Sequence, residues 1–97
     1  MIIFELLWDD GNVRHIVEDN GIRPQEVDEA VVADPVLFRR LRNKMLVVGR
    51  TQGGRFISVI LEPKGDGEWR PVTARQSDTK ETRWARELLD KRRKGGR

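Results

Sequence analysis

The stretch MLVVGRTQGGRFISVILE, residues 45–62, contains two apolar runs separated by a short polar segment with adjacent glycines. Val, Ile and Phe favour strands, and short Gly-containing segments join neighbouring strands in hairpins. We therefore predict strands at 45–51 and 55–62, joined by the turn QGG. This hairpin is the basis from which the rest of the fold is predicted.

The segment after the hairpin predicts one more strand and a long helix. PKGDGE (63–68) is typical of a turn, and WRPVTARQ (69–76) of a strand. Pro71 cannot donate a backbone hydrogen bond, so this strand is expected at a sheet edge or with a bulge there. The final helix is expected from Asp78 to Lys94, with a buried stripe on one side formed by Trp84, Ala85, Leu88 and Leu89.

The segment before the hairpin predicts a strand at 2–8 and two helices. Asp9 or Asp10 caps the first helix, and Gly21 ends it in a left-handed conformation. Pro24 begins the second helix, where its missing N–H has no cost, and Pro35 ends it. Residues 36–44 are interpreted as either a basic helical turn or a loop.

The predicted order of elements is β-α-α-β-β-β-α. Three hairpin-linked strands indicate an antiparallel sheet whose single apolar face the helices cover. The prediction is thus a two-layer α+β fold with an antiparallel sheet of about four strands. A chain of 97 residues suits one small domain, which we place at residues 1–94, followed by a frayed basic tail at 95–97.

Composition narrows the classes of function. The chain has no Cys and one His, which argues against thiolate and zinc sites, so no metal or cofactor is expected. No apolar run reaches the roughly 20 residues of a membrane span, and the start MIIFELLWDD lacks the basic region of a signal peptide. A cytoplasmic protein without a membrane partner is the expectation.

Charge is distributed unevenly along the chain. Residues 1–34 have a net charge of −7, whereas residues 35–63 and 64–97 each have +5, for a total of +3. This asymmetry is consistent with binding of nucleic acid or another polyanion. A merely solvated, arginine-rich surface explains it equally well.

Four motifs, in order, resemble those of the BrnT-like toxin family. They are WDDGNVRHIVEDNGI (8–22), QEVDEAV (25–31), VVGRTQGGR (47–55) and VTARQSDTKETRW (72–84). The chain departs from the family pattern at three positions. Asn20 stands where relatives have a second His, Thr82 where Arg is common, and Trp84 where they have Tyr.

The resemblance implies a RelE-like fold and the toxin of a bacterial type II toxin–antitoxin pair. It implies a metal-independent endoribonuclease that cleaves RNA through attack by the 2′-hydroxyl. It also implies a ribbon-helix-helix antitoxin encoded nearby as the partner, with operator DNA bound only through that antitoxin.

Such RNA cleavage requires proton transfer and positive charge around the phosphate. We expect catalytic roles for Arg75, Glu81, His15 and Arg50, and phosphate binding by Arg55, Lys80 and Arg83. Arginine suits phosphate because its fork stays charged and contacts two oxygens. His15 is the chain's single imidazole, and Glu81 would need a raised pKa to act near neutral pH.

Structural roles compete with each of these chemical roles. Asp78 and Glu81 have the spacing of a helix capping box, and an Arg75–Glu81 ion pair would attach the helix to the sheet. Asn12, His15 and Asp19 form one polar stripe that either faces solvent or contacts the second helix. The alternative function is therefore a non-catalytic module of the same fold that binds a protein partner or nucleic acid.

Overall fold

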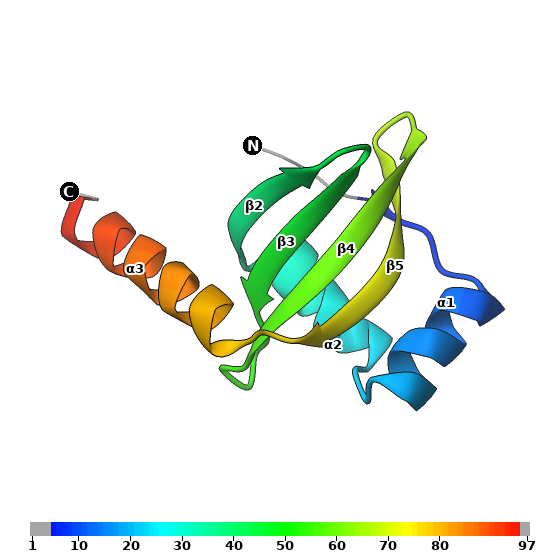
Figure 1. Cartoon of the computed structure of the whole chain (residues 1–97), viewed down its shortest axis with the longest axis horizontal. Coiled ribbons are helices and arrows are strands. Elements are labelled where there is room, and N and C mark those ends of the chain that lie inside the picture. The colour runs from blue at the N-terminus through cyan, green and yellow to red at the C-terminus, as the bar shows by residue number, and fades with distance from the viewer. Residues whose placement is uncertain (1–4, 96–97) are drawn as a thin grey trace.

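The protein is a five-stranded mixed sheet with helices on both faces (Figure 1). The computed structural model describes residues 5–95. The sheet order is β1-β5-β4-β3-β2. Its strands are β1 (Glu5–Leu6), β2 (Pro35–Leu41), β3 (Lys44–Arg50), β4 (Phe56–Gly65) and β5 (Glu68–Gln76). The predicted α+β class is confirmed.

Two predictions about the strands are corrected. Residues 36–44, expected as a helical turn or loop, lie mostly in β2, which pairs antiparallel with β3. The sheet therefore has five strands rather than about four. The strand predicted at 2–8 is described only as Glu5–Leu6, which pairs parallel with β5, and residues 2–4 lie outside the described part.

The prediction of a bulge at Pro71 is confirmed. Ile60 pairs with Thr73 while Leu61 pairs with Pro71, so the register between β4 and β5 shifts by one residue at this point. The bulge has a structural use, because the carbonyl oxygen of Pro71 accepts a hydrogen bond of 3.0 Å from the amide of the buried Asn12. The first helix is thereby attached to β5.

The first helix begins and ends, and the second helix begins, where the sequence predicts. α1 (Asp10–Arg14) continues into the π-helical turns η1 (His15–Asp19), and α2 (Pro24–Asp28) continues into η2 (Glu29–Ala33). Asp9 is the N-cap of α1, and Arg70 is the main reason why the pKa of Asp9 is lowered to about 2. Gly21, at φ +70°, provides the left-handed residue after η1.

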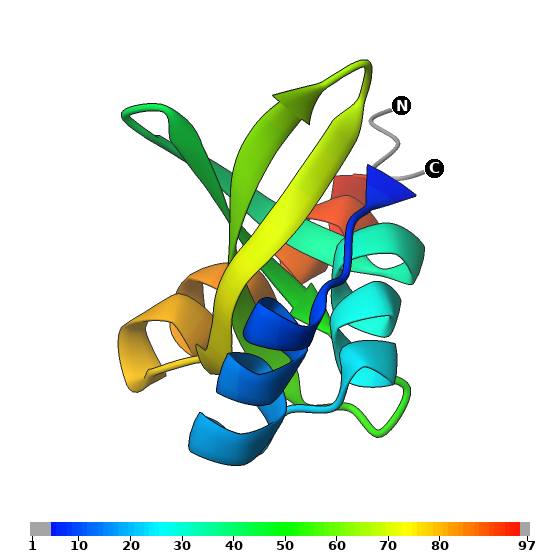
Figure 2. The same ribbon diagram turned by 90° about the vertical axis from the view of Figure 1, so that its right-hand side faces the viewer.

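The last helix, α3 (Thr79–Gly95), packs on the sheet face opposite α1 and α2 (Figure 2). The expectation of helices on one face is thus corrected for α3. Two hydrophobic clusters result: one under α1 and α2, around Ile16, Val27 and Val59, and one under α3, around Val48 and Ala85. Of the predicted basic tail, Gly95 ends α3, and residues 96–97 lie outside the described part.

A glycine sets the distance between the second helix and the sheet. A Cβ atom built on Gly49 would lie 1.8 Å from the carbonyl oxygen of Ala30 in η2. Ala30 is fully buried, and its backbone belongs to a packed helix. Only a residue without a side chain permits this approach.

Gly49→Ala is therefore expected to lower the free energy of unfolding by about 3 kcal/mol, the upper end of typical overpacking costs. Urea denaturation measures the change. Gly53→Ala is the matched control, because its added Cβ would meet only the Thr51 hydroxyl at 3.8 Å. A loss of stability that is equal in the two variants would contradict the packing argument.

Candidate ribonuclease site

The junction between β5 and α3 is organised by one buried carboxylate. The Glu81 backbone N–H donates to Asp78 Oδ1 at 2.8 Å, and Glu81 Oε1 accepts from the Asp78 N–H at 3.0 Å. This is the capping box that the spacing predicts. Glu81 is 8% exposed, so the start of α3 lies against the sheet.

Arg75 forms a two-pronged salt bridge with the same carboxylate. Its Nη1 and Nη2 atoms donate to Glu81 Oε1 and Oε2 at 2.7 and 2.8 Å. Ser58 Oγ, on β4, donates to Oε1 at 2.9 Å. The predicted ion pair is therefore present, and it joins β4, β5 and α3.

These contacts determine the ionisation of Glu81. Burial by itself raises the pKa of the carboxyl, but the hydrogen bonds from Arg75, the Asp78 backbone and Ser58 outweigh it and lower the pKa. The raised pKa that proton transfer near neutral pH requires is absent. Glu81 is thus an ionised group that holds Arg75 in position.

His15 lies against β5 and is oriented by hydrogen bonds at both ring nitrogens. Nδ1 lies 2.9 Å from Asp19 Oδ2, and Nε2 lies 3.2 Å from Thr73 Oγ1. Asn20 Nδ2 donates to the same hydroxyl at 3.2 Å and to the Ala74 carbonyl at 2.7 Å. The predicted solvent-facing stripe is therefore confirmed for His15 and Asp19, which are exposed. Asn12 is buried, and both Asn12 and His15 contact β5 rather than the second helix.

His15 and Arg75 are brought to neighbouring positions along β5. His15 contacts Thr73, and Thr73 and Arg75 are two positions apart on β5. Residues two apart in a strand point to the same face, so Thr73 and Arg75 lie on one side of β5, about 7 Å from each other. The side chains of His15 and Arg75 are 46% and 51% exposed. We call His15, Asp19, Thr73 and Arg75 the β5 site.

The remaining predicted phosphate ligands are not gathered at the β5 site. Arg50 pairs with Asp34 at 2.9 Å, and Arg55 pairs with Glu26 of α2 at 2.7 Å. On α3, Lys80 lies 4.9 Å from the centre of the Trp84 ring, and Arg83 is exposed. Arg50 and Arg55 thus each form an ion pair with a carboxylate other than Glu81, the partner of Arg75.

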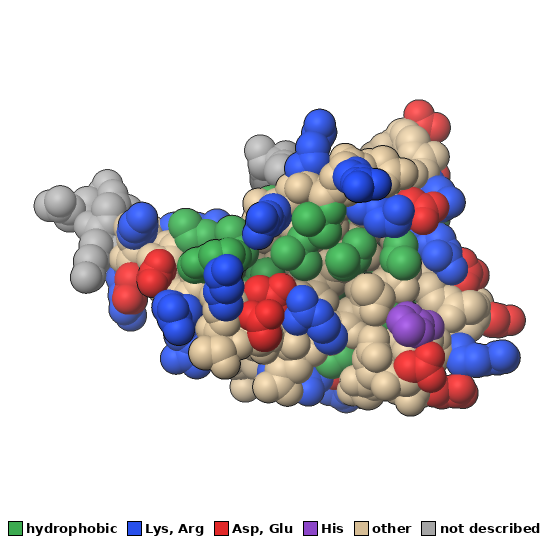
Figure 3. Space-filling model, viewed as in Figure 1, with side chains coloured by type: hydrophobic (Ala, Val, Ile, Leu, Met, Phe, Trp, Pro, Cys, Tyr) green, Lys and Arg blue, Asp and Glu red, His purple; other side chains and the backbone are tan. Residues whose placement is uncertain are grey.

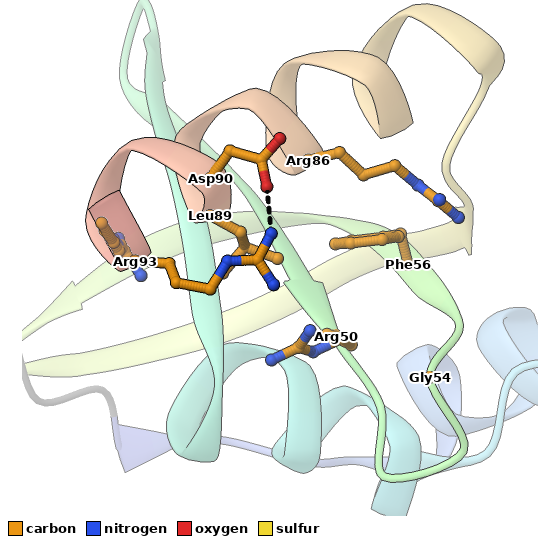
Figure 4. A pocket seen from close by; sticks show the side chains of 8 residues that line it. Arg50, Gly54, Phe56, Arg86, Leu89, Asp90 and Arg93 are labelled. Carbon is orange, nitrogen blue, oxygen red and sulfur yellow. Dashed lines mark hydrogen bonds and ion pairs between the residues drawn. The ribbon is translucent and has the colours of Figure 1, made fainter. Parts of the chain in front are cut away.

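Arg50 instead lines a basic cleft between α3 and the β3–β4 hairpin (Figure 4). The cleft has a volume of about 730 Å³, and its lining residues are Arg50, Gly54, Phe56, Arg86, Leu89, Asp90, Arg92 and Arg93. Of the arginines on α3, the sequence pointed to Arg83 but not to the cleft residues Arg86, Arg92 and Arg93. The helical spacing of positions 86, 89, 90 and 93 was the available signal.

Within residues 5–95, no group of three or more His, Asp and Glu side chains is placed to hold a metal ion. None of the helices in this described part is long and apolar enough to cross a membrane.

The sheet topology defines a class: small α+β proteins with the RelE-like arrangement expected from the sequence. The chain is similar to the 1.1 Å crystal structure of the Brucella abortus ribonuclease toxin BrnT, with a TM-score of 0.63 and 17% sequence identity. The match covers 78% of this chain and 99% of that chain. The resemblance to BrnT-like toxins is therefore confirmed at the level of the fold.

Comparison at the level of sequence adds nothing further. No protein-family model matches the chain, and no curated protein matches it.

Glu81→Gln is expected to lower the free energy of unfolding by about 2 kcal/mol near neutral pH, because charge-assisted hydrogen bonds are lost. The folded-state pKa of Glu81 lies below its ordinary value of 4.5. The stabilisation is therefore complete above that value and declines as the pH falls through the folded-state pKa. Urea denaturation at about pH 7 and about pH 3 measures the difference between variant and wild type.

Glu87→Gln serves as the control for this measurement, since Glu87 is exposed on the same helix. Its effect on stability is expected to stay within about 0.5 kcal/mol. A Glu81→Gln effect of the same size at both pH values would show that the carboxylate charge is not what holds α3 to the sheet.

Proposed function

We propose that this protein is the toxin of a bacterial type II toxin–antitoxin system and a metal-independent endoribonuclease. The observation that carries the proposal is the exposed imidazole of His15, oriented by Asp19 and in contact with Thr73, which lies two residues before Arg75 on β5. The likeness in fold to a ribonuclease toxin supports it.

The reaction is transfer of the phosphate to the neighbouring 2′-hydroxyl. The 2′-oxygen gives its proton to the base and attacks phosphorus, the bond from phosphorus to the 5′-oxygen breaks, and the leaving 5′-oxygen takes a proton from water. His15 is the group proposed to take the 2′-proton at Nε2, because Asp19 fixes the ring through Nδ1. The 2′-hydroxyl would replace the Thr73 hydroxyl, whose contact with Nε2 is 3.2 Å.

Arg75 is proposed to stabilise the negative charge that develops on the phosphate. A guanidinium has five N–H donors, and the contacts with Glu81 use one on each terminal nitrogen. Other donors of this half-exposed side chain remain for phosphate oxygens. Glu81 is then a positioning residue, since it fixes the guanidinium without touching RNA.

The Arg75–Glu81 pair also favours the second candidate, a non-catalytic binding module. Both side chains already have a structural function, because they attach α3 to the sheet. Asn20, which cannot transfer a proton near neutral pH, holds Thr73 and Ala74 in place. If the protein is such a module, the β5 site binds a partner but catalyses no reaction.

The partners proposed are an RNA substrate and a ribbon-helix-helix antitoxin encoded nearby, with operator DNA reached only through the antitoxin. The proposed location is the bacterial cytoplasm, where such RNA occurs.

His15→Ala is expected to reduce the rate of RNA cleavage by roughly 10²–10⁴-fold, the usual contribution of a proton-transfer group. Arg75→Lys should also reduce it, because Lys keeps the charge but not the fork. The measurement is cleavage of a labelled single-stranded RNA in the presence of a chelator. Arg14→Gln, an exposed change on α1, is the control and should keep wild-type activity.

If the wild type and His15→Ala show equal, negligible turnover while both bind RNA, the enzyme proposal is wrong and the binding module is favoured.

Expression of the wild type in bacteria is expected to arrest growth, and co-expression of the adjacent antitoxin gene is expected to restore it. Growth curves measure both effects, and co-purification tests whether the two proteins associate. Normal growth of cells that contain soluble wild-type protein would contradict the toxin proposal. The His15→Ala variant should allow growth without the antitoxin while still binding it.

A further inference from the structure

The basic cleft lies at the same end of the sheet as the β5 site but on different strands. Arg50 closes β3 and pairs with Phe56 at the start of β4, whereas Arg75 pairs with Ser58 on the other side of β4. The two arginines are therefore two strand spacings apart across the sheet, about 10 Å. Lys and Arg side chains border the exposed hydrophobic strip of this face, together with some Asp and Glu side chains (Figure 3).

The four arginines of the cleft are held in place by contacts with the protein. Arg93 pairs with Asp90 at 2.6 Å, and Arg92 donates to the Val36 carbonyl at 3.1 Å. Arg86 lies over the Phe56 ring, 5.6 Å from its centre, and the fourth contact is the Arg50–Asp34 pair. Side chains restrained in this way lose less conformational entropy when they bind a ligand.

The charge of the cleft is strongly positive. Among the described residues, four arginines and one acidic residue, Asp90, line it, and Asp34 pairs with Arg50 from outside the lining. In Figure 4, Arg50 from β3 and Arg93 from α3 point into the same space. Guanidinium groups on two sides of a cavity of about 730 Å³ suit an anion with several oxygens.

We propose that this cleft binds the phosphate backbone of RNA, as a site separate from the β5 site. The inference rests on the proposed function and adds Arg86, Arg92 and Arg93 to it. Binding here would hold the strand beside the β5 site without taking part in the reaction.

An acidic protein partner fits the cleft less well. Protein interfaces depend on apolar or aromatic anchors that fill pockets. The apolar lining consists of Leu89 and Phe56, and the Phe56 ring already carries Arg86 on its face. Phosphate groups can bind to the arginines at the rim of the cleft without any apolar anchor, so the observations favour RNA as the ligand.

The test measures binding of a fluorescent 2′-O-methyl RNA, which lacks the nucleophile and cannot be cleaved. The variant is Arg86→Gln/Arg93→Gln, and its control is Arg14→Gln/Arg40→Gln, which removes the same charge from exposed positions outside the cleft. Each phosphate contact to a single strand contributes about 0.7 to the salt slope, or about 5-fold in affinity at about 0.1 M salt. The cleft variant should thus bind about 25-fold more weakly, with a slope smaller by about 1.4.

The control variant should lose less than about threefold, since distant exposed charges are screened. Thermal denaturation of both variants verifies folding. Equal weakening by the two variants, or no RNA binding by the wild type, would overturn the inference. Unchanged RNA binding with lost antitoxin binding would overturn it as well and assign the cleft to the protein partner.

The inference and the proposed function fail separately. If the wild type cleaves RNA and the cleft variant binds RNA as well as the wild type does, the ribonuclease proposal stands and the proposal that the cleft binds RNA is wrong. If the cleft variant binds RNA more weakly but the wild type does not cleave it, the cleft proposal stands and the ribonuclease proposal is wrong.

Discussion

The buried carboxylate of Glu81 is the interaction on which the arrangement of this protein depends. It accepts hydrogen bonds from Ser58 on β4, Arg75 on β5 and the backbone at the start of α3. A buried charge is stabilising only when its partners are complete, and here both oxygens have donors. Glu81 fixes the start of α3, and the hydrophobic cluster around Val48 and Ala85 holds the rest of the helix, which forms one wall of the basic cleft, against the sheet.

The same carboxylate connects the structural and chemical roles of Arg75. The carboxylate of Glu81 and the Gln76 carbonyl fix the orientation of the guanidinium, while the Arg75 side chain stays half-exposed. The sequence raised the question of whether Arg75 belongs to a site or fastens a helix. The geometry allows both, because the fastening also orients the charge beside His15 and Thr73.

Local sequence patterns predicted much of this fold, but they did not predict contacts between segments that are far apart in the sequence. The β3–β4 hairpin, the Gly21 and Asp9 caps and the Asp78–Glu81 box each depend on residues close in sequence, and each is present. The two faces of β2 pack against different hydrophobic clusters, so Val36, Leu37 and Phe38 are all apolar. This lack of alternation is why the strand was not predicted. Without alternation, a strand has no distinctive period.

The sequence pointed to only part of the β5 site: His15 and Arg75 were expected to act in catalysis, Asp19 was noted only in a polar stripe, and Thr73 was not singled out. His15 and Asp19 are recognisable as neighbours on one helix, yet the contact of His15 with Thr73 spans 58 positions and depends on how that helix crosses β5. Catalytic roles were expected for both Arg50 and Arg75, but β4 lies between their strands. The direction of a helix across a sheet is set by packing, which local sequence does not determine.

The outer strand β2 has a consequence for how this protein behaves at high concentration. An unpaired strand edge invites a second chain to extend the sheet and begin aggregation. Two consecutive exposed arginines, Arg39 and Arg40, lie on β2, with Arg42 in the turn that follows. Like charges on the β2 strands of two molecules repel each other. The arginines therefore hinder pairing of this unpaired edge with the sheet of another copy.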